Sequence, residues 1–276
     1  MYKKAKYFIS GNAVIETVNF DIQELEIGFS VYEVVKIIGG IPLFFEDHLR
    51  RLYQSAGFKN TKITFKEEEI KETVYKLIQI NTIQEGRLKF AVRFHKSGNK
   101  LICFFLKPII PTEDNYKNGV KIISVQAERE NPNAKVINYN LRTYINKVIE
   151  NNDIFEVLLY NKKHIISECG KSNIFFVKDA VIYTSFSENV LSGITGSYIS
   201  EICKNENIKI TNCNIKLSDI PEYEAAFITG TSIAVLPIKQ IDSSYFSANN
   251  EVISLLSDNY NRMAANYINS KRLQQI

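Results

Sequence analysis

The sequence predicts a two-domain protein of the α/β class (α+β type), in which a small mixed α/β domain precedes a larger, β-rich one. With 276 residues, 45% of them hydrophobic, the chain can bury one large core or two of moderate size. Segments rich in β-branched residues alternate with amphipathic segments of helical spacing. Residues 111–119 interrupt both patterns with proline, asparagine and glycine, so we interpret them as a linker between a domain 1–110 and a domain 120–276.

The small domain is expected to contain two hairpins and two helices. Gly39-Gly40 separates two apolar runs, as in a tight hairpin turn, and a second pair of strands surrounds the polar segment 96–100. Leu49 and Leu52 are spaced as on one face of a helix. The expected elements are strands 31–38 and 41–45, helices 46–57 and 65–80, and strands 87–95 and 101–107.

The larger domain is expected to combine short strands with three helices. Polar turns at 161–163 and 178–179 divide its first half into short strands. The expected elements are helix 138–152, short strands within 155–183, helix 195–205, strands 208–213, 225–229 and 233–238, and a closing helix 252–270.

Charge and composition argue against several functional classes. The 34 Lys and Arg residues are scattered among 30 Asp and Glu residues, so the net charge of +4 does not indicate a nucleic-acid surface. Four cysteines without CxxC spacing and three histidines offer little for a zinc site and fit a reducing cytoplasm. We expect no signal peptide, and no apolar run approaches the roughly twenty residues that cross a bilayer. We therefore expect a cytoplasmic protein that binds no nucleic acid, metal or membrane.

Five separated motifs carry the candidate chemistry, spread from about Val31 to Pro237. A lysine stands ahead of a glutamate that opens a turn rich in glycine, serine and asparagine. The motifs are Val31-Tyr-Glu-Val-Val-Lys36, His48-Leu-Arg-Arg-Leu52, Lys135-Val-Ile-Asn138, Ser167-Glu-Cys-Gly-Lys-Ser-Asn173, and Leu191-Ser-Gly-Ile-Thr-Gly196 together with Thr229-Gly-Thr-Ser232. In this order they resemble the class IV aminotransferases, which are the fold type IV pyridoxal phosphate enzymes.

The resemblance implies that Lys135 is the catalytic residue and carries pyridoxal 5'-phosphate as a Schiff base, within the larger domain. An amine suits this chemistry because it can attack the cofactor aldehyde and later move a proton as general base and acid. Glu168 matches the carboxylate that holds the pyridine nitrogen protonated, so that the ring accepts electrons. Standing alone, Glu168 would be interpreted as a carboxylate at a strand end.

Further residues match the family's cofactor contacts. Arg51 matches the arginine that pairs with the phosphate, although alone it would be interpreted as a solvated residue on a helix face. The backbone N–H groups of Ile194 and Thr195 at a helix start, and the hydroxyl of Thr231, would receive the same phosphate. Tyr139 either hydrogen-bonds the ring hydroxyl of the cofactor or packs in the fold, and both interpretations stay open.

Four other lysines compete with Lys135 for the Schiff base. They lie within a predicted helix, in a predicted turn, or in the turn that follows Glu168, and a turn does not hold an amine rigidly. The Lys-x-x-Asn setting and the spacing from Glu168 favour Lys135. The competing residues are Lys147, Lys162, Lys163 and Lys171.

The chain departs from the family pattern at several positions. Cys169 is unusual in the glutamate turn, and Gly196 stands where relatives usually have arginine. D-amino acid aminotransferases bind the substrate carboxylate with a tyrosine and an Arg-x-His pair. Leu25 lies near the position of the first, and Arg93-Phe-His95 is the nearest match for the second.

The resemblance implies an aminotransferase that moves an amino group between an amino acid and a 2-oxo acid, with the substrate and its D or L configuration left open. It also implies a homodimer. The alternative function is a 4-amino-4-deoxychorismate lyase that forms p-aminobenzoate and pyruvate, but Val34 stands near the position where those lyases carry threonine. A catalytically silent protein would have no physical reason to keep Arg51, Lys135 and Glu168 together.

Overall fold

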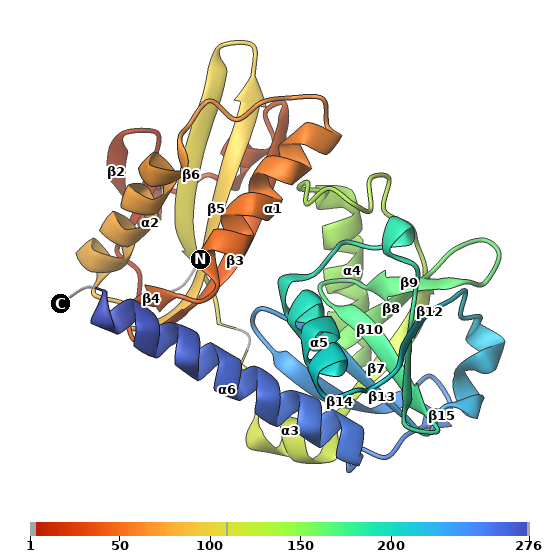
Figure 1. Ribbon diagram of the computed structural model, residues 1–276. Coiled ribbons are helices and arrows are strands. Elements are labelled where there is room, and N and C mark those ends of the chain that lie inside the picture. The colour runs from red at the N-terminus through yellow and green to blue at the C-terminus, as the bar shows by residue number, and fades with distance from the viewer. Residues whose placement is uncertain (1–3, 109, 275–276) are drawn as a thin grey trace. The chain divides into compact units, whose positions relative to one another are not determined.

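The computed structural model describes residues 4–108 and 110–274, which fall into two compact units (Figure 1). Unit 1 consists of the described residues of Met1–Ile109, together with Ala134–Ile137 and the described residues of Ala264–Ile276. Unit 2 consists of Ile110–Asn133 and Asn138–Met263. Each unit has its own sheet and its own apolar core, and the predicted mixed class of helices and strands is confirmed.

These units differ from the predicted domains in three places. Ala134–Ile137, which carry the candidate lysine, join unit 1 because their backbone pairs with a strand of its sheet. The end of the last helix also joins unit 1, where Tyr267 donates a hydrogen bond to Glu46. The expected linker 111–119 contains a short helix, α3 (Glu113–Asn118), and belongs to unit 2.

Unit 1 is built on a six-stranded antiparallel sheet in the order β2-β1-β6-β5-β3-β4. The turn between β3 and β4 is Gly39-Gly40, whose φ angles of 57° and 76° suit a tight hairpin. The β5–β6 turn is tighter than predicted, because pairing continues to His95 and Gly98. The elements are β1 (Tyr7–Ser10), β2 (Ala13–Glu16), the 3-10 helices Thr17–Asn19 and Ile22–Leu25, β3 (Phe29–Ile38), β4 (Ile41–Pro42), α1 (Phe45–Phe58), α2 (Glu67–Asn81), β5 (Glu85–His95) and β6 (Gly98–Leu106).

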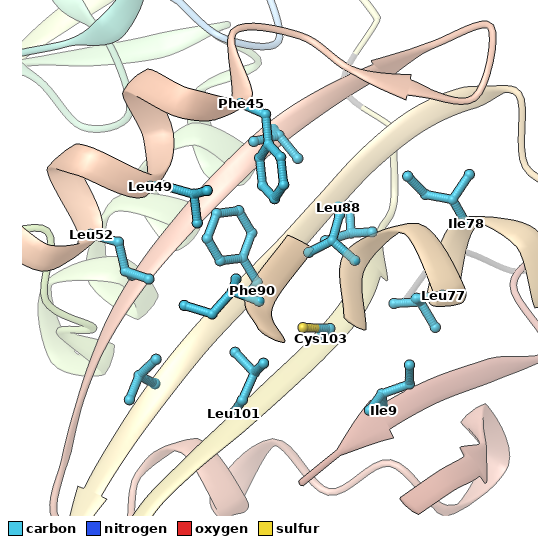
Figure 2. Packing of buried hydrophobic residues seen from close by; sticks show 14 of the residues in the cluster. Ile9, Phe45, Leu49, Leu52, Leu77, Ile78, Leu88, Phe90, Leu101 and Cys103 are labelled. Atoms are coloured by element: carbon cyan, nitrogen blue, oxygen red, sulfur yellow. The ribbon is translucent and has the colours of Figure 1, made fainter. Parts of the chain in front are cut away.

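One face of this sheet packs against α1 and α2 and forms the core of unit 1 (Figure 2). Side chains alternate between the faces of a strand, so Leu88 and Phe90 of β5 point to the same side, where the Phe90 ring lies beside Leu49 of α1. The ring of Phe45 at the start of α1 lies edge-on to Phe90, with centroids 5.6 Å apart. Burying each such side chain is worth about 1.5–3 kcal/mol, and this packing fixes α1 against the sheet.

Unit 2 is built on a mixed nine-stranded sheet in the order β12-β11-β10-β13-β14-β7-β8-β9, with β15 beside β14. Strand β7 is parallel to both of its neighbours, and α4 connects it to β8. The elements are α3, β7 (Val120–Gln126), α4 (Tyr139–Asn152), β8 (Glu156–Tyr160), β9 (Ile166–Cys169), β10 (Asn173–Lys178), β11 (Val181–Thr184), the 3-10 helix Ser187–Asn189, α5 (Ile194–Asn205), β12 (Ile210–Asn212), the 3-10 helix Leu217–Glu222, β13 (Ala225–Gly230), β14 (Ala234–Ile241), β15 (Ser244–Tyr245) and α6 (Glu251–Leu273), whose last residues belong to unit 1.

Two kinds of feature, a membrane-spanning helix and a metal-binding group of side chains, are not found among the described residues. None of their helices is long and apolar enough to cross a membrane. Within residues 4–108 and 110–274, no group of His, Cys, Asp and Glu side chains is placed to hold a metal ion.

Two glycines of unit 1 should respond oppositely to alanine. Gly28 has a φ angle of 78°, and a Cβ there would lie 2.2 Å from the carbonyl oxygen of Phe94. Gly57 lies near the end of α1 with open space around it. We expect Gly28→Ala to lower the free energy of unfolding by about 1–3 kcal/mol and Gly57→Ala to raise it by about 0.5–1 kcal/mol. Urea unfolding of both variants measures this, and equal midpoints would contradict it.

Candidate active site

Lys135 is carried on the edge of the unit 1 sheet. Its carbonyl oxygen accepts a hydrogen bond from the N–H of Tyr32 at 3.0 Å, and the N–H of Ile137 donates to the carbonyl of Ser30, also at 3.0 Å. These bonds add residues 134–137 antiparallel to β3, with Val136 opposite Val31. The backbone of the lysine is therefore fixed by a strand from a distant part of the sequence.

Two side chains of unit 1, those of Ser55 and Tyr32, contact Lys135. Its N–H donates to the buried Oγ of Ser55 on α1 at 3.1 Å. Its Nζ lies 5.1 Å from the centre of the Tyr32 ring, and the Nζ of Lys89 lies 4.5 Å from the same ring centre. Lys89 is therefore a second amine beside this tyrosine. The sequence contained a sign of it, since a lysine interrupts an otherwise apolar strand segment.

Arg51 is engaged by a carboxylate that the sequence analysis missed. Glu33 on β3 accepts hydrogen bonds from Nε and Nη2 of Arg51 at 2.6 and 2.7 Å, and it lies 2.7 Å from Nδ1 of His48. All three side chains are buried. The fork of a guanidinium matches two carboxylate oxygens, so this pairing orients Arg51 more strictly than a single contact would.

The sequence signal for this cluster was a charge in a core position. Glu33 lies two residues from Val31 and two from Val35 along β3, and both valines are fully buried. Its side chain therefore points to the same face of the strand as theirs. His48 and Arg51 are three residues apart on α1 and therefore share one face of that helix.

Burial and charge act in opposite directions on this cluster. Burial by itself would raise the pKa of Glu33, but the charges and hydrogen bonds of Arg51 and His48 outweigh it and hold the pKa far below its usual value of 4.5. Burial lowers the pKa of His48 below its usual 6.5, although Glu33 opposes that change. With Glu33 ionised, Nδ1 of the neutral His48 ring is the donor.

In unit 2, Glu168 lies on β9 with a side chain that is 4% exposed. An oxygen of its carboxylate, Oε1, is 2.8 Å from Nε of Arg129, a residue that the sequence analysis did not single out. Nη2 of Arg129 also donates to the carbonyl oxygen of Gly170 at 3.0 Å. The carboxylate expected to meet the cofactor nitrogen is thus paired with a cation from the segment after β7.

The predicted phosphate-binding helix start is present at α5. Gly193 precedes this helix, and no side chain caps its first turn. A Cβ on Gly193 would lie 1.9 Å from Oδ1 of Asn173, whose amide nitrogen donates to the carbonyl of Leu191 at 2.9 Å. Close packing of this asparagine therefore requires glycine. Ile194 and Thr195 are buried in the first turn of α5.

Other polar groups of unit 2 lie near this turn. The buried hydroxyl of Thr229 has no hydrogen-bond partner among the described residues. It lies 3.7 Å from where a Cβ on Gly196 would stand. The Thr195 hydroxyl is 3.4 Å from the hydroxyl of Tyr260, and Thr231 lies half-buried in the turn between β13 and β14. An orphaned buried hydroxyl beside an uncapped helix start fits an oxygen-rich group such as phosphate.

The remaining sequence-predicted residues are placed as follows. Tyr139 is the half-buried first residue of α4, and Asn138 caps that helix by accepting a hydrogen bond from the N–H of Leu141 at 3.0 Å. The Lys-x-x-Asn setting therefore has a structural meaning, because its asparagine begins a helix. The four competing lysines are all exposed: Lys147, Lys162, Lys163 and Lys171.

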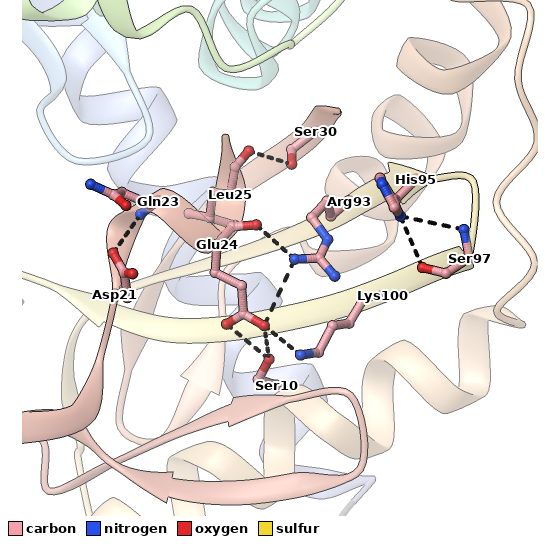
Figure 3. Close-up of polar contacts among 10 residues, drawn as sticks. All are labelled: Ser10, Asp21, Gln23, Glu24, Leu25, Ser30, Arg93, His95, Ser97 and Lys100. Carbon is pink, nitrogen blue, oxygen red and sulfur yellow. Dashed lines mark hydrogen bonds and ion pairs between the residues drawn. The ribbon is translucent and has the colours of Figure 1, made fainter. Parts of the chain in front are cut away.

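Arg93 and His95, the nearest match for a substrate-binding pair, make contacts within unit 1 (Figure 3). Nη1 of Arg93 donates to the carbonyl oxygen of Glu24 at 3.0 Å and lies 3.9 Å from its carboxylate, which also pairs with Lys100. Nδ1 of His95 lies 2.9 Å from Oγ of Ser97. Arg93 therefore serves to hold the segment before β3 on the sheet.

Comparison with known proteins decides the family. The family described as amino-transferase class IV matches residues 30–241. This chain belongs to that family. The class IV aminotransferases depend on pyridoxal phosphate, so the sequence-based predictions of family and enzyme class are confirmed.

Similar proteins support the same conclusion for this class IV aminotransferase. A D-alanine aminotransferase of Bacillus licheniformis is 27% identical over 82% of this chain and 83% of its own length. A "Probable branched-chain-amino-acid aminotransferase" of Rickettsia bellii is 28% identical over 85% of this chain and 86% of its own length. Transamination, the function predicted first, is therefore confirmed as the activity of the chain.

Solved structures share the fold at lower identity. The branched-chain aminotransferase of Thermoproteus uzoniensis, determined with norvaline, has a TM-score of 0.82 and 18% identity and covers 95% of both chains. The branched-chain aminotransferase of Escherichia coli also has a TM-score of 0.82, with 17% identity, and covers 94% of this chain and 95% of its own.

The buried cluster around Glu33 should make the free energy of unfolding decrease as the pH is lowered. The folded chain holds the pKa of Glu33 below its usual value of 4.5, so the stabilisation is complete above that value and is lost as the pH falls below it. His48 acts in the same direction below its usual 6.5, because the unfolded chain binds a proton that the folded chain resists. We expect Glu33→Gln to lower the free energy of unfolding at pH 7 by about 3–5 kcal/mol. It should also flatten the decline below pH 4.5, where the unfolded chain takes up a proton on Glu33 that the folded chain resists.

Urea unfolding at each pH measures both effects. Glu26→Gln is the matched control, because Glu26 is exposed in the same unit. The idea fails if the Glu33 and Glu26 variants show the same midpoints across this pH range.

Proposed function

We propose that this class IV aminotransferase binds pyridoxal phosphate through Lys135 and uses that lysine to move the substrate proton. The observation that carries the proposal is the backbone pairing of residues 134–137 with β3 and with Ser55. A catalytic amine must be held in a fixed place, and the competing lysines in unit 2 are exposed.

Each unit holds residues that match the family's contacts to the cofactor. In unit 1, Arg51 would meet the phosphate with its guanidinium, which Glu33 already orients. In unit 2, the N–H groups of Ile194 and Thr195 would receive it without a positive side chain, because a helix start carries the positive end of the helix dipole. Thr231 would add a hydroxyl.

When bound, pyridoxal phosphate supplies an electron-accepting ring that stabilises the negative charge left by loss of a substrate proton. Lys135 would take that proton on Nζ as general base and return it as general acid. Glu168 would accept a hydrogen bond from the protonated ring nitrogen. Tyr139 would donate or accept at the ring hydroxyl.

Lys135→Ala should remove covalent cofactor binding and lower turnover by several orders of magnitude while the chain stays folded, because no other amine takes its place. Borohydride treatment of the wild type, followed by peptide mass spectrometry, should find the reduced cofactor on Lys135. Lys147→Ala is the control and should label normally, since Lys147 is exposed on α4. Label on Lys89, the second amine beside Tyr32, would show that the assignment to Lys135 is wrong.

We also propose that the chain is a cytoplasmic homodimer. The unpaired state of its four cysteines suits a reducing compartment. Family membership favours the dimer. Light scattering at working concentration should give a mass close to twice the 31.7 kDa of one chain. A fully active species with the mass of a single chain would rule the dimer out.

A further inference from the structure

Arg129 holds the turn that begins at Glu168. Its Nε lies 2.8 Å from one carboxylate oxygen of Glu168, while its Nη2 donates to the carbonyl oxygen of Gly170 at 3.0 Å. The side chains are 16% and 4% exposed, so water screens this ion pair little. One guanidinium thus makes an ion pair with the side chain and a hydrogen bond with the backbone of the same short turn.

A neighbouring carboxyl group shows what burial does without such a partner. Measured over the whole residue, Glu156 on β8 and Glu168 are each 3% exposed. No ion pair to Glu156 is found within the described part of the chain. Burial raises the pKa of Glu156, and the more distant charges of Lys171 and Arg142 only partly oppose the shift. The pKa of the Cys169 thiol is raised mainly by burial, and the charges of both carboxyl groups raise it further.

Removing Arg129 would take away a positive charge that the buried Glu168 contacts. A buried carboxyl group favours its neutral form, whereas an opposite charge in direct contact favours the ionised form. Glu168 contacts Arg129 directly, and Glu156 lies across Cys169 from it. Arg129 is thus a positive charge in direct contact with Glu168.

We propose that Arg129 is a positioning residue that keeps Glu168 ionised and thereby keeps the shared proton on the cofactor ring nitrogen. The inference rests on the proposed function, in which Glu168 meets that nitrogen. A proton shared by a carboxylate and a pyridine nitrogen resides on the stronger base. Contact with a guanidinium makes the carboxylate the weaker base, so the proton stays on the ring nitrogen. No bond other than that to the shared proton changes.

The geometry also distinguishes arginine from lysine at this position. Arg129 reaches the carboxylate of Glu168 and the carbonyl of Gly170 with two different nitrogens of one planar group. A lysine ammonium supplies the charge but not the fork. Arg129→Lys should therefore keep the proton on the ring nitrogen, as in wild type, while the turn is held less firmly.

The test follows the proton directly. Wild type, Arg129→Met, Arg129→Lys and Glu168→Gln are loaded with pyridoxal phosphate labelled with ¹⁵N in the ring, and the nitrogen resonance is recorded at neutral pH. We expect the protonated position in wild type and Arg129→Lys. We expect a shift toward the unprotonated position in Arg129→Met, as in Glu168→Gln. The single-turnover rate of amino transfer should fall at least tenfold in Arg129→Met.

Arg142→Met is the matched control, because Arg142 is a half-buried arginine of the same unit that acts on Glu156 instead. A wild-type resonance in Arg129→Met overturns the inference, and so does an equal shift in Arg142→Met, which would indicate a general structural effect. If Arg129→Met does not fold, an unprotonated signal in Arg129→Lys overturns it as well. Wild type that takes up no cofactor would overturn the proposed function itself, and this result is seen before any variant is compared.

Discussion

The buried carboxylate of Glu33 is the contact on which the first half of the candidate site depends. It joins β3 to α1 through Arg51 and His48. The same strand pairs with residues 134–137, and the same helix supplies Ser55 to the N–H of Lys135. A well-packed apolar pair could join a strand and a helix with equal stability, but it would not fix the direction of a guanidinium. The cluster therefore combines a structural joint with the orientation of a candidate phosphate ligand.

Unit 2 uses the same pairing of carboxylate and arginine with a different consequence. In unit 1 the carboxylate of Glu33 orients Arg51, which we expect to contact the cofactor. In unit 2 the order is reversed, since Arg129 holds Glu168, the residue expected to make the contact. Glu156, equally buried but without an ion pair in the described structure, has a raised pKa. The two neighbouring carboxyl groups thus differ in their direct contacts, since Glu168 meets a guanidinium at 2.8 Å.

Features that depend on neighbouring residues could be predicted from the sequence. The Gly39-Gly40 turn, the longer helices and the start of α5 follow from local patterns, whereas the short helix α3 was not predicted. Partners brought together by tertiary structure could not. Glu33 had to be placed by strand register, Arg129 by the packing of a loop on β9, and Lys135 by pairing with a distant strand. Hence the family motifs indicated the chemistry, while the charges that control it and the unit that carries the lysine came from the structure.

The contacts of Arg93 bear on how the substrate is chosen. The resemblance to D-amino acid aminotransferases made Arg93 and His95 candidates for binding a substrate carboxylate. Arg93 instead donates to the carbonyl of Glu24, whose carboxylate also pairs with Lys100. A substrate carboxylate beside Arg93 would bring a second negative charge close to that of Glu24, which is unfavourable. In this structure Arg93 serves the fold, so the likeness of one short motif is a poor guide to the substrate.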